Sequence, residues 1–473
     1  MDENESEIEK NIKELEELAE KVRTLKKDYR QRRPIVIEFC GAPKSGKTSC
    51  ISSLNLFLKR NGFKTGVIAE QASICPIKDK HSPVFNVWTA NSTIGLLCSM
   101  LDPRRNDQLD IIICDRAVFD ALCWFKWMLF KGTLDSSEYQ CLTDYISMAR
   151  WANKIDLVYI FKASPEISIK REYAHLLTRK PGSIMNQKIL AEYLKSIELA
   201  KEDFGDRFRM VQEIDTTEIK QDEVSAEVTR TILHKLEELI IEKVGFVDKN
   251  VPEIQNLFAK EGVNNFKWLE KMDIPLEKIE FNRRDEVERN NKQLQFIPIG
   301  VLTNPEHSRV LILKKQPDAA KNSAEKNAYL TWFGGHMREE DKINGLETFE
   351  EVAKVTLKRE TEEELGISIS LDSIKPYYLY STAHEKSTNH LAICFLIEKD
   401  LDNLKLSINT DELLTNKGTS KSGTFIDIEE LKRGQIGPFE EWSKIILSKL
   451  FGAEIEFQNE QMAIPFSFDD RFV

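Results

Sequence analysis

Short apolar runs alternate with helix-length segments over the first half of the chain. The runs with the length of a buried strand are Ile35–Phe39, Thr65–Ala69, Leu109–Cys114 and Leu157–Phe161. Strands that alternate with helical segments are typical of a parallel sheet with crossover helices, because each helix carries the chain back to the start of the next strand. We therefore expect an α/β domain over residues 33–244, with the sheet as the middle of three layers.

The pattern changes in the second half of the chain. Further strand-like runs lie at Phe296–Leu302, Val310–Lys314, Leu391–Ile397 and Gly423–Ile428. One long helix is expected among them at Thr348–Leu365, with Thr348 and Glu351 as a capping box at its start and Gly366 at its end. A single helix embedded between strand runs indicates an α+β domain over residues 291–473.

Two further segments are expected to be helical. Residues 245–290 are interpreted as a helical connection that ends in the charged stretch Arg283–Arg289. Residues 1–32 are rich in charge and place apolar residues at helical spacing: Ile8, Ile12, Leu15, Ala19 and Val22. This stripe suits a helix that lies on the first domain. A helix that joins two copies of the chain into a homo-oligomer is the less favoured alternative.

Composition narrows the class of protein. Apolar residues make up 41% and charged residues 31% of the chain, as in ordinary globular proteins, and the apolar runs are strand-sized rather than membrane-sized. The acidic start lacks the features of a secretory signal, so we expect a cytoplasmic protein with no membrane partner. The net charge of −11 argues against a nucleic-acid polymer as a partner. The eight cysteines contain no CxxC pair and are expected to be reduced core thiols.

A phosphate-binding loop follows the first expected strand. Gly41–Thr48 reads GAPKSGKT, comes directly after Pro34–Cys40 and is followed by an expected helix at Ser49–Leu58. In this setting the loop N–H groups turn onto phosphates, the lysine reaches the β- and γ-phosphates, and the last hydroxyl can hold Mg²⁺. The expected nucleotide-binding residues are Gly41, Ala42, Pro43, Lys44, Ser45, Gly46, Lys47, Thr48 and Ser49.

Other polar residues after the expected strands suit phosphoryl transfer. Asp115 can hold Mg²⁺ or its waters, and Arg116 can meet an acceptor phosphate. Glu70 is placed where it could bind or deprotonate an acceptor hydroxyl, although a surface glutamate explains it nearly as well. Arg171 and Arg179 belong to a basic stretch that can close over the transferring group or can simply face solvent.

On these residues, positions 34–240 resemble the thymidylate kinase and deoxynucleoside kinase group of P-loop kinases. The resemblance implies that ATP is the phosphate donor, that the Asp115–Arg116 pair handles catalysis and the acceptor, and that arginines of a lid clamp phosphate. Gln71–Trp88, where the acceptor pocket is expected, matches no pattern of this group, so the acceptor could be a nucleoside or a nucleotide.

A second candidate site lies on the expected helix of the second domain. Glu360, Glu363 and Glu364 stand at positions i, i+3 and i+4, which places three carboxylates on one face. Like charges repel, so such a cluster is easier to explain if hard cations such as Mg²⁺ or Mn²⁺ bind among them. Taken alone, the cluster would be explained better as a solvated acidic face.

Further residues complete a recognised pattern. Gly345, Glu351 and Arg359-Glu-Thr-Glu-Glu-Glu-Leu-Gly-Ile367 satisfy the Nudix signature, and from about Gln295 onward the chain resembles a Nudix hydrolase. The resemblance implies a Nudix fold and Mg²⁺-dependent attack of water on a diphosphate linked to another group. Glu360, Glu363 and Glu364 would be the metal ligands, with Glu363 also counted as catalytic, and Arg359 would orient a glutamate.

One departure from the family pattern leaves two interpretations open. The pair Gly334-Gly335 lies ten residues ahead of Gly345, whereas it usually adjoins the signature. Either Gly335 is the true loop glycine, or the loop is expanded. A general base outside the signature is also expected, and Glu385 and Glu412 are equal candidates.

The two motifs together predict a bifunctional enzyme that uses ATP and Mg²⁺, or Mn²⁺, and acts on small nucleotides or nucleosides. In the favoured reading a P-loop kinase is fused to a Nudix hydrolase. The alternative is a P-loop domain that senses ATP and controls the hydrolase or a partner.

Overall fold

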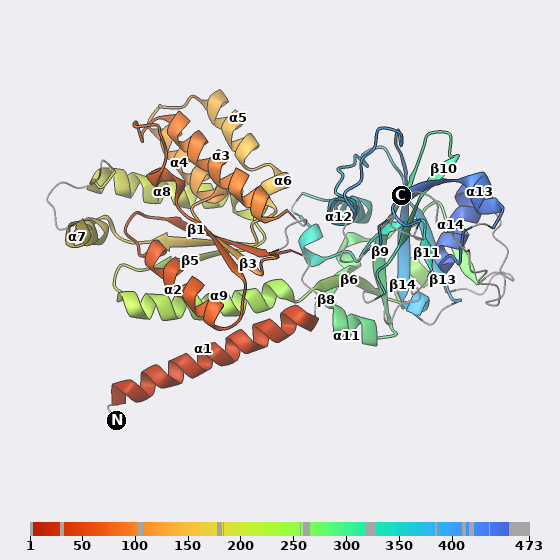
Figure 1. The fold of residues 1–473 in the computed structure, drawn as a ribbon, viewed down its shortest axis with the longest axis horizontal. Helices are drawn as coiled ribbons and strands as arrows, with labels where there is room; N and C mark the ends of the chain where they lie inside the picture. The colour runs from red at the N-terminus through yellow and green to blue at the C-terminus, as the bar shows by residue number, and fades with distance from the viewer. Residues whose placement is uncertain are drawn as a thin grey trace, which may run out of the picture. The chain divides into compact units, whose positions relative to one another are not determined.

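The structure is a computed structural model that divides into two compact units, Met1–Glu242 and Lys243–Val473, called here the first and second unit. It describes residues 3–28, 33–102, 107–176, 182, 184–255, 257–258, 265–317, 328–343, 345–383, 386–408, 413–415, 421–434 and 436–453. Figure 1 shows a central sheet flanked by helices in the first unit and a larger sheet in the second.

The first unit is built on a five-stranded parallel sheet. Its strands are β1 (Ile35–Gly41), β2 (Thr65–Ile68), β3 (Ile111–Asp115), β4 (Leu157–Lys162) and β5 (Val211–Asp215), in the order β2-β3-β1-β4-β5. The four strands expected from the apolar runs are confirmed. The pattern did not predict β5 because this strand, Val-Gln-Glu-Ile-Asp, is mostly polar and only partly buried.

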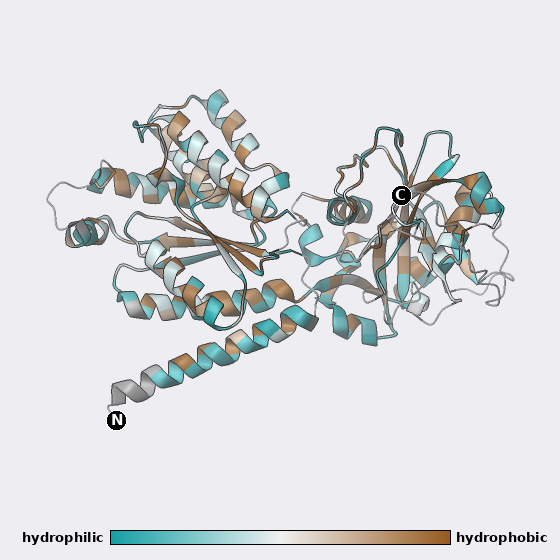
Figure 2. Cartoon of the chain, in the orientation of Figure 1, coloured by the Kyte–Doolittle hydropathy of each residue, from teal (hydrophilic) through white to brown (hydrophobic). Residues whose placement is uncertain are grey.

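Helices cover both faces of this sheet, as expected for three layers (Figure 1). The helices are α2 (Lys47–Arg60), α3 (Pro83–Met100), α4 (Val118–Phe130), α5 (Ser136–Ile146), α6 (Ala149–Ala152), α7 (Pro165–Leu176), α8 (Gln187–Phe204) and α9 (Gln221–Ile240). Alternate residues of β1 enter different cores: Val36 packs with residues of α4 and α8, whereas Ile37 packs with residues of α2 and α9. The strands are accordingly among the most apolar segments in Figure 2.

The N-terminal helix α1 (Glu3–Asp28) packs along α9. Leu15, Ala19 and Val22 are buried in the core that α2 and α9 share, while Ile12 is 49% exposed. A salt bridge of 2.6 Å between Lys21 and Glu237 supports the packing. The N-terminal segment is therefore a helix that lies on the first unit, as favoured from the sequence. Association of two copies through α1 stays a prediction.

The second unit is built on a mixed ten-stranded sheet around a long central strand. The central strand β9 (Gln293–Thr303) pairs in parallel with β14 (His390–Glu398) and antiparallel with β10 (Arg309–Lys314) and β12 (Phe333–Gly334). The remaining strands are β6 (Lys243–Asp248), β7 (Phe266–Leu269), β8 (Glu280–Arg283), β11 (Tyr329–Leu330), β13 (Tyr377–Ser381) and β15 (Thr424–Asp427). The helices are α10 (Pro252–Gln255), α11 (Arg284–Arg289), α12 (Phe349–Leu365), α13 (Ile428–Lys432) and α14 (Glu441–Phe451).

The expectation of a helical connection over 245–290 is wrong. Most of β6 and the whole of β7 and β8 lie in this segment and pair into the second sheet. Among the residues of this segment that the structure describes, the helical ones are α10, α11 and a short 3₁₀ turn at Leu276–Lys278. The charged stretch Arg283–Arg289 suggested a helix, but the short apolar groups before it, such as Val244–Val247, find partners on β8 and β9. Strand pairing over long sequence separation overrides local charge pattern here.

The helix that carries the glutamates begins and ends as expected. The side-chain hydroxyl of Thr348 accepts the N–H of Glu351 and the Glu351 carboxylate accepts the N–H of Thr348, which is a capping box. Gly366 ends the helix in the left-handed conformation with φ of 65°. The helix packs on β9 and β12, which fixes the face that carries Glu360 and Glu364 against the sheet.

Two expectations from composition can be compared with the fold. Within the described residues, no helix combines the length and the apolar character that crossing a membrane requires. All eight cysteines are unpaired, but only five are buried; Cys98 and Cys141 are exposed and Cys75 is partly exposed, so the expectation of core thiols holds for the five alone.

Candidate functional site

The GAPKSGKT segment forms a tight loop between β1 and α2. Gly41 has φ of 113°, and a Cβ atom added there would lie 2.2 Å from the carbonyl oxygen of Phe161 on β4. Gly46 has φ of 97° and immediately precedes α2. Only glycine adopts these conformations without strain, so both glycines are required for the loop to turn at the sheet edge.

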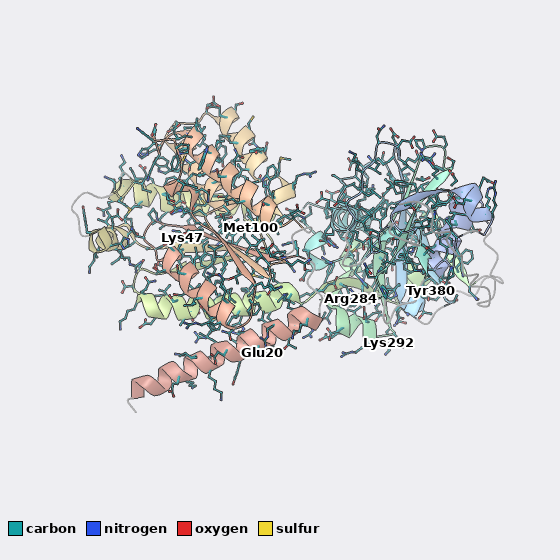
Figure 3. All side chains as sticks on the ribbon, viewed as in Figure 1. Glu20, Lys47, Met100, Arg284, Lys292 and Tyr380 are labelled. Atoms are coloured by element: carbon teal, nitrogen blue, oxygen red, sulfur yellow. The ribbon has the colours of Figure 1, made fainter. Side chains whose placement is uncertain are left out.

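Lys47 points back into this loop and is buried in the first unit, where Figure 3 labels it. Its ammonium group donates to the carbonyl oxygens of Gly41 at 3.1 Å and Ala42 at 2.7 Å. Burial and then the nearby Arg116 lower the pKa of Lys47 to about 8. A cation held inside a loop of this shape is placed to meet phosphate oxygens.

The first unit brings a hydroxyl and a carboxylate together beside the loop. The Oγ1 of Thr48 donates to Oδ2 of Asp115 at 3.0 Å. The other oxygen of Asp115, Oδ1, is buried and has no hydrogen-bond partner, and burial raises the pKa of this carboxyl group. Hydroxyl and carboxylate oxygens are the ligands that Mg²⁺ takes, so these two residues fit that ion.

The structure brings Glu70 and Arg116 together beside Asp115, where β2 and β3 end. The Nε of Arg116 lies 2.8 Å from Oε1 of Glu70, and its NH1 donates to Oδ1 of Asp120 at 2.6 Å. Burial acts to lower the pKa of Arg116, but the carboxylates of Asp120 and Glu70 hold it well above its usual value. The backbone of Arg116 has φ of 67°, which is uncommon for a residue other than glycine.

Sequence reasoning missed two carboxylates of this site. Glu38 is fully buried on β1 and accepts three backbone N–H groups at the start of α4, from Ala117, Phe119 and Asp120, at 2.8–3.0 Å. Burial raises the pKa of Glu38 to about 7, although the three backbone hydrogen bonds act to lower it. Asp120 in turn accepts the hydroxyl of Tyr193 at 3.0 Å. A glutamate inside the apolar strand Ile-Val-Ile-Glu-Phe-Cys was the available signal for Glu38.

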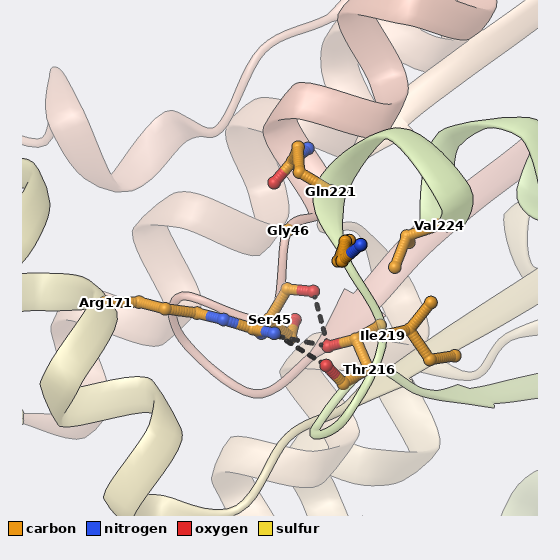
Figure 4. A pocket seen from close by; sticks show the side chains of 8 residues that line it. Ser45, Gly46, Arg171, Thr216, Ile219, Gln221 and Val224 are labelled. Atoms are coloured by element: carbon orange, nitrogen blue, oxygen red, sulfur yellow. Dashed lines mark hydrogen bonds between the residues drawn. The ribbon is translucent and has the colours of Figure 1, made fainter. Parts of the chain in front are cut away.

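Arg171 lies at the opposite side of the loop, on α7. Its guanidinium donates to the Thr216 carbonyl at 2.6 Å and the Lys44 carbonyl at 3.3 Å, and Thr216 donates to the Ser45 carbonyl at 2.9 Å. Arg171, Thr216 and Ser45 border a cavity of about 280 Å³, and Figure 4 shows the side chains that line it. It is lined by Ser45, Gly46, Arg171, Thr216, Ile219, Lys220, Gln221 and Val224. Arg179 lies outside the described residues.

The carboxylates of the second unit are held against the glycine pair. Glu364 accepts the N–H of Gly334 at 3.0 Å, and a Cβ atom added to Gly335 would lie 2.7 Å from Oε1 of Glu360. Glu360 is fully buried. By contrast, a Cβ atom added to Gly345 would meet nothing within 4 Å. Gly335 is thus the glycine that the carboxylates require, and Gly345 forms a separate turn with φ of 89° in the expanded loop.

Arg359 contacts two of the three glutamates. Its NH1 donates to Oε1 of Glu360 at 2.5 Å and to Oε2 of Glu363 at 3.4 Å. Burial acts to lower the pKa of Arg359, but Asp341 and Glu360 hold it well above its usual value. A second guanidinium, that of Arg338, lies 3.7 Å from Glu360 and 3.9 Å from Glu363.

The glutamates of α12 offer carboxylate oxygens, the donors that hard divalent cations prefer. Within the described ranges, no group of three or more His, Cys, Asp or Glu side chains is arranged to hold a metal ion. Guanidinium groups of Arg359 and Arg338 supply the positive charge beside Glu360 and Glu363 in this structure. The carboxylate donors, and the space beside Glu360 that a Cβ atom at Gly335 would fill, fit Mg²⁺ or Mn²⁺. The two candidate bases, Glu385 and Glu412, lie outside the described residues.

Neither protein-family models nor curated proteins give a match to this chain. Solved structures with similar folds include Tm1382, a candidate Nudix hydrolase, at 24% identity and a TM-score of 0.29, covering 45% of this chain and 99% of that one. They also include deoxyadenosine kinase from M. mycoides with dCMP and dCDP, at 16% identity, a TM-score of 0.33, and coverage of 43% and 100%. The same kinase with dCTP has 16% identity, a TM-score of 0.32, and coverage of 42% and 99%. At such TM-scores the likenesses carry no functional information, so function has to be inferred from the site residues.

Proposed function

We propose that the chain is a bifunctional enzyme of nucleotide metabolism. The first unit would transfer phosphate from ATP to a nucleoside or nucleotide, and the second would hydrolyse a nucleoside-diphosphate derivative. One observation carries the proposal: the first unit gathers Lys47, Thr48, Asp115, Arg116 and Glu70 around one glycine loop. A loop, a cation, a hydroxyl–carboxylate pair and a carboxylate–guanidinium pair are the parts that phosphoryl transfer needs.

The residues of the first unit suggest how the transfer would proceed. The loop N–H groups and Lys47 would hold the donor phosphates, and Thr48 and Asp115 would hold Mg²⁺, which offsets phosphate charge when bound. With a nucleoside as acceptor, Glu70 would take the proton of the acceptor hydroxyl while the hydroxyl oxygen attacks the γ-phosphorus and ADP leaves. With a monophosphate as acceptor, an ionised phosphate oxygen attacks, ADP leaves, and no proton has to be removed. Arg116 stays between Glu70 and Asp120 and would orient the acceptor.

The cavity of Figure 4 supports a place for the donor base. It opens beside Ser45 and Gly46 of the loop and is walled by Arg171 on one side and by Ile219 and Val224 on the other. A flat base could stack on the planar guanidinium while the aliphatic side chains pack on its other face. A nucleoside triphosphate bound in this way would run from the cavity along the loop.

The glutamates of α12, with Arg359 on the same helix and Arg338 ahead of it, support the hydrolase half of the proposal. Glu360, Glu363 and Glu364 would hold divalent cations, which lower the pKa of bound water when present. Of the three, Glu363 is the least buried and would be able to accept a proton from the attacking water. The water oxygen would attack one phosphorus of the diphosphate, and the other phosphate would leave with its attached group.

The two activities would work in sequence rather than against each other. Acting on one nucleotide in opposite directions, they would only waste ATP. A hydrolase that frees a nucleoside monophosphate from a diphosphate derivative supplies an acceptor for a kinase.

The test is a substrate screen of the purified full-length chain by mass spectrometry, with Mg²⁺, with and without ATP. The panel holds nucleosides, nucleoside monophosphates and nucleoside diphosphates that bear a second group. Phosphorylated acceptors support the kinase, and cleaved diphosphates support the hydrolase. ATP turnover that needs no acceptor and changes the rate of the second unit would favour an ATP-sensing switch instead.

A further inference from the structure

Asp341 lies in the expanded loop between the glycine pair and α12. It ends a short 3₁₀ turn, η4 (Glu339–Asp341), and is only 2% exposed although it carries a carboxylate. The Arg359 guanidinium donates two parallel hydrogen bonds to the Asp341 carboxylate, from Nε to Oδ1 and from NH2 to Oδ2, both of 2.8 Å. Such a bidentate pair fixes the plane and the rotation of a guanidinium group.

The carboxylate is itself held from two other directions. The hydroxyl of Thr356, on α12, donates to Oδ2 at 2.9 Å, and the backbone N–H of Arg338 donates to the same oxygen at 2.9 Å. Asp341 is therefore anchored both to the helix and to its own loop. Its position does not depend on the Arg359 contact alone.

The other edge of the Arg359 guanidinium faces the signature glutamates. While Nε and NH2 bind Asp341, NH1 donates to Glu360 at 2.5 Å and to Glu363 at 3.4 Å. The chain of contacts runs from Asp341 through Arg359 to both carboxylates. A change at Asp341 is expected to reach the candidate metal ligands through the arginine.

Glu351, the signature glutamate that seven residues separate from Arg359, makes different contacts. Its Oε2 accepts the N–H groups of Glu347 and Thr348, both at 2.9 Å, and the Thr348 hydroxyl at 3.0 Å. Its carboxylate is exposed and caps the first turn of its own helix. These bonds account for Glu351 as a helix cap.

We propose that Asp341, rather than the signature residue Glu351, is the positioning residue for Arg359 in this chain; the proposal rests on the proposed hydrolase function. Asp341 offsets the charge of Arg359 and fixes the plane from which NH1 reaches Glu360 and Glu363, so the arginine orients these two carboxylates without carrying an uncompensated charge beside them. The loop expanded between Gly335 and Gly345 is then a functional part of the site, since it supplies this carboxylate.

Two matched variants of the full-length chain separate these assignments: Asp341→Asn and Glu351→Gln, each of which removes one charge and keeps the shape. The first readout is Mn²⁺ alone, titrated by electron paramagnetic resonance. Asp341→Asn is expected to weaken Mn²⁺ binding about tenfold, because outer-shell partners of metal ligands typically contribute that much. Glu351→Gln is expected to stay within about twofold of the unchanged protein, since it is remote from the metal ligands. Equal affinities for Asp341→Asn and the unchanged protein, or a larger loss for Glu351→Gln, would overturn the assignment.

The second readout uses whichever diphosphate of the screen the unchanged protein cleaves. Asp341→Asn is expected to lower kcat about 10- to 100-fold, because Arg359 and the carboxylates it contacts would lose their fixed positions. KM should change less than about threefold, because Asp341 does not bind the substrate. Arg359→Lys and the double variant complete a cycle: the double variant should be little worse than either single one, because both remove the same bidentate contact. Losses that simply multiply would contradict the proposal.

Two further results distinguish a failure of the proposed hydrolase function from a failure of the Asp341 assignment. If the unchanged protein cleaves no diphosphate, the proposed function fails, while the Mn²⁺ comparison still tests Asp341. If Asp341→Asn unfolds, Thr356→Val removes only one of its anchors and leaves the Arg359 contact, so a smaller loss of Mn²⁺ affinity, about two- to fivefold, is expected. No loss in Thr356→Val would then count against the proposal.

Discussion

Thr48 at the start of α2 donates a hydrogen bond of 3.0 Å to Asp115 at the end of β3. The contact joins the phosphate loop to the neighbouring parallel strand, and it leaves Oδ1 of Asp115 buried without a hydrogen-bond partner. A buried carboxylate oxygen without a donor is costly, and burial raises the pKa of Asp115 accordingly. A cation bound at this oxygen would remove that cost, which is why the pair is placed at the centre of the proposed kinase site.

Asp115→Asn is expected to lower phosphoryl transfer about 100-fold at saturating ATP, because the site would lose electrostatic stabilisation of the transferring group. Steady-state release of ADP in the presence of the acceptor, measured across a Mg²⁺ series, checks this. Thr48→Ser is the control, since it keeps the hydroxyl, and it should retain most of the activity. Full activity in Asp115→Asn would show that this carboxylate has no part in the reaction.

Lys47 predicts a pH dependence of nucleotide binding. Burial lowers the pKa of its ammonium group to about 8, so in the free protein the cation is present below that pH and is lost above it. ATP affinity should therefore fall as the pH rises from 7 to 9.5. Isothermal titration calorimetry of Lys47→Arg gives the comparison: arginine stays charged, so its affinity, although weaker overall, should lose this slope. An equal slope in both proteins would assign the titration to another group.

The fold was predictable where apolar runs had the right length and clear ends. β1, β3 and β4 are buried strands composed mainly of apolar residues. The helix α12 has both a capping box and a terminal glycine, so the positions of all four elements follow from local chemistry. The strands β6, β7 and β8 were not predictable in this way. These strands are short, and they form because tertiary structure gives each a neighbour to pair with: β6 pairs with β8 and β9, and β7 pairs with β13.

The site residues likewise divide into those that follow from local sequence and those that depend on the fold. Lys47, Thr48 and the glutamates of α12 were found because their spacing within one motif carries the chemistry. Asp120 and Asp341 were missed because their partners are reached through the fold: Asp341 lies 18 residues before Arg359 in a loop that no motif describes. Burial decides these cases, since a carboxylate with no water around it has to find a donor or a cation.

Asp156 predicts acid sensitivity of the first unit. It is buried and forms a bidentate pair with Arg33, at 2.8 Å for both bonds, and it accepts the N–H of Val36 at 2.9 Å. Burial opposes ionisation, but Arg33 holds the pKa of Asp156 below its usual value in the folded chain. The pair therefore stabilises the fold at pH values above the unfolded pKa of about 3.9, and this stability is lost as the pH falls through the lower folded value.

Asp156→Asn should accordingly reduce the free energy of unfolding by about 3 kcal/mol at pH 7, with a difference that shrinks below about pH 4. Urea unfolding followed by pulsed hydrogen exchange of β1 peptides reports on the first unit specifically. Asp203→Asn is the control: its pair with Lys126 lies at the surface, and its loss should cost less than about 1 kcal/mol. A difference for Asp156→Asn that stays constant down to pH 2 would contradict the pKa argument.

Gly335→Ala and Gly345→Ala separate the two glycines of the second site. In Gly335→Ala the new methyl group would lie 2.7 Å from Oε1 of Glu360, so the carboxylate has to move, and Mn²⁺ affinity is expected to fall about tenfold. In Gly345→Ala the methyl group enters open space, and only the positive φ of 89° is strained, which costs about 1–2 kcal/mol of stability without disturbing Glu360. Electron paramagnetic resonance with Mn²⁺ and thermal unfolding of both variants measure the two effects. If Gly345→Ala weakened Mn²⁺ binding more than Gly335→Ala, the signature glycine rather than the glycine pair would be shaping the site.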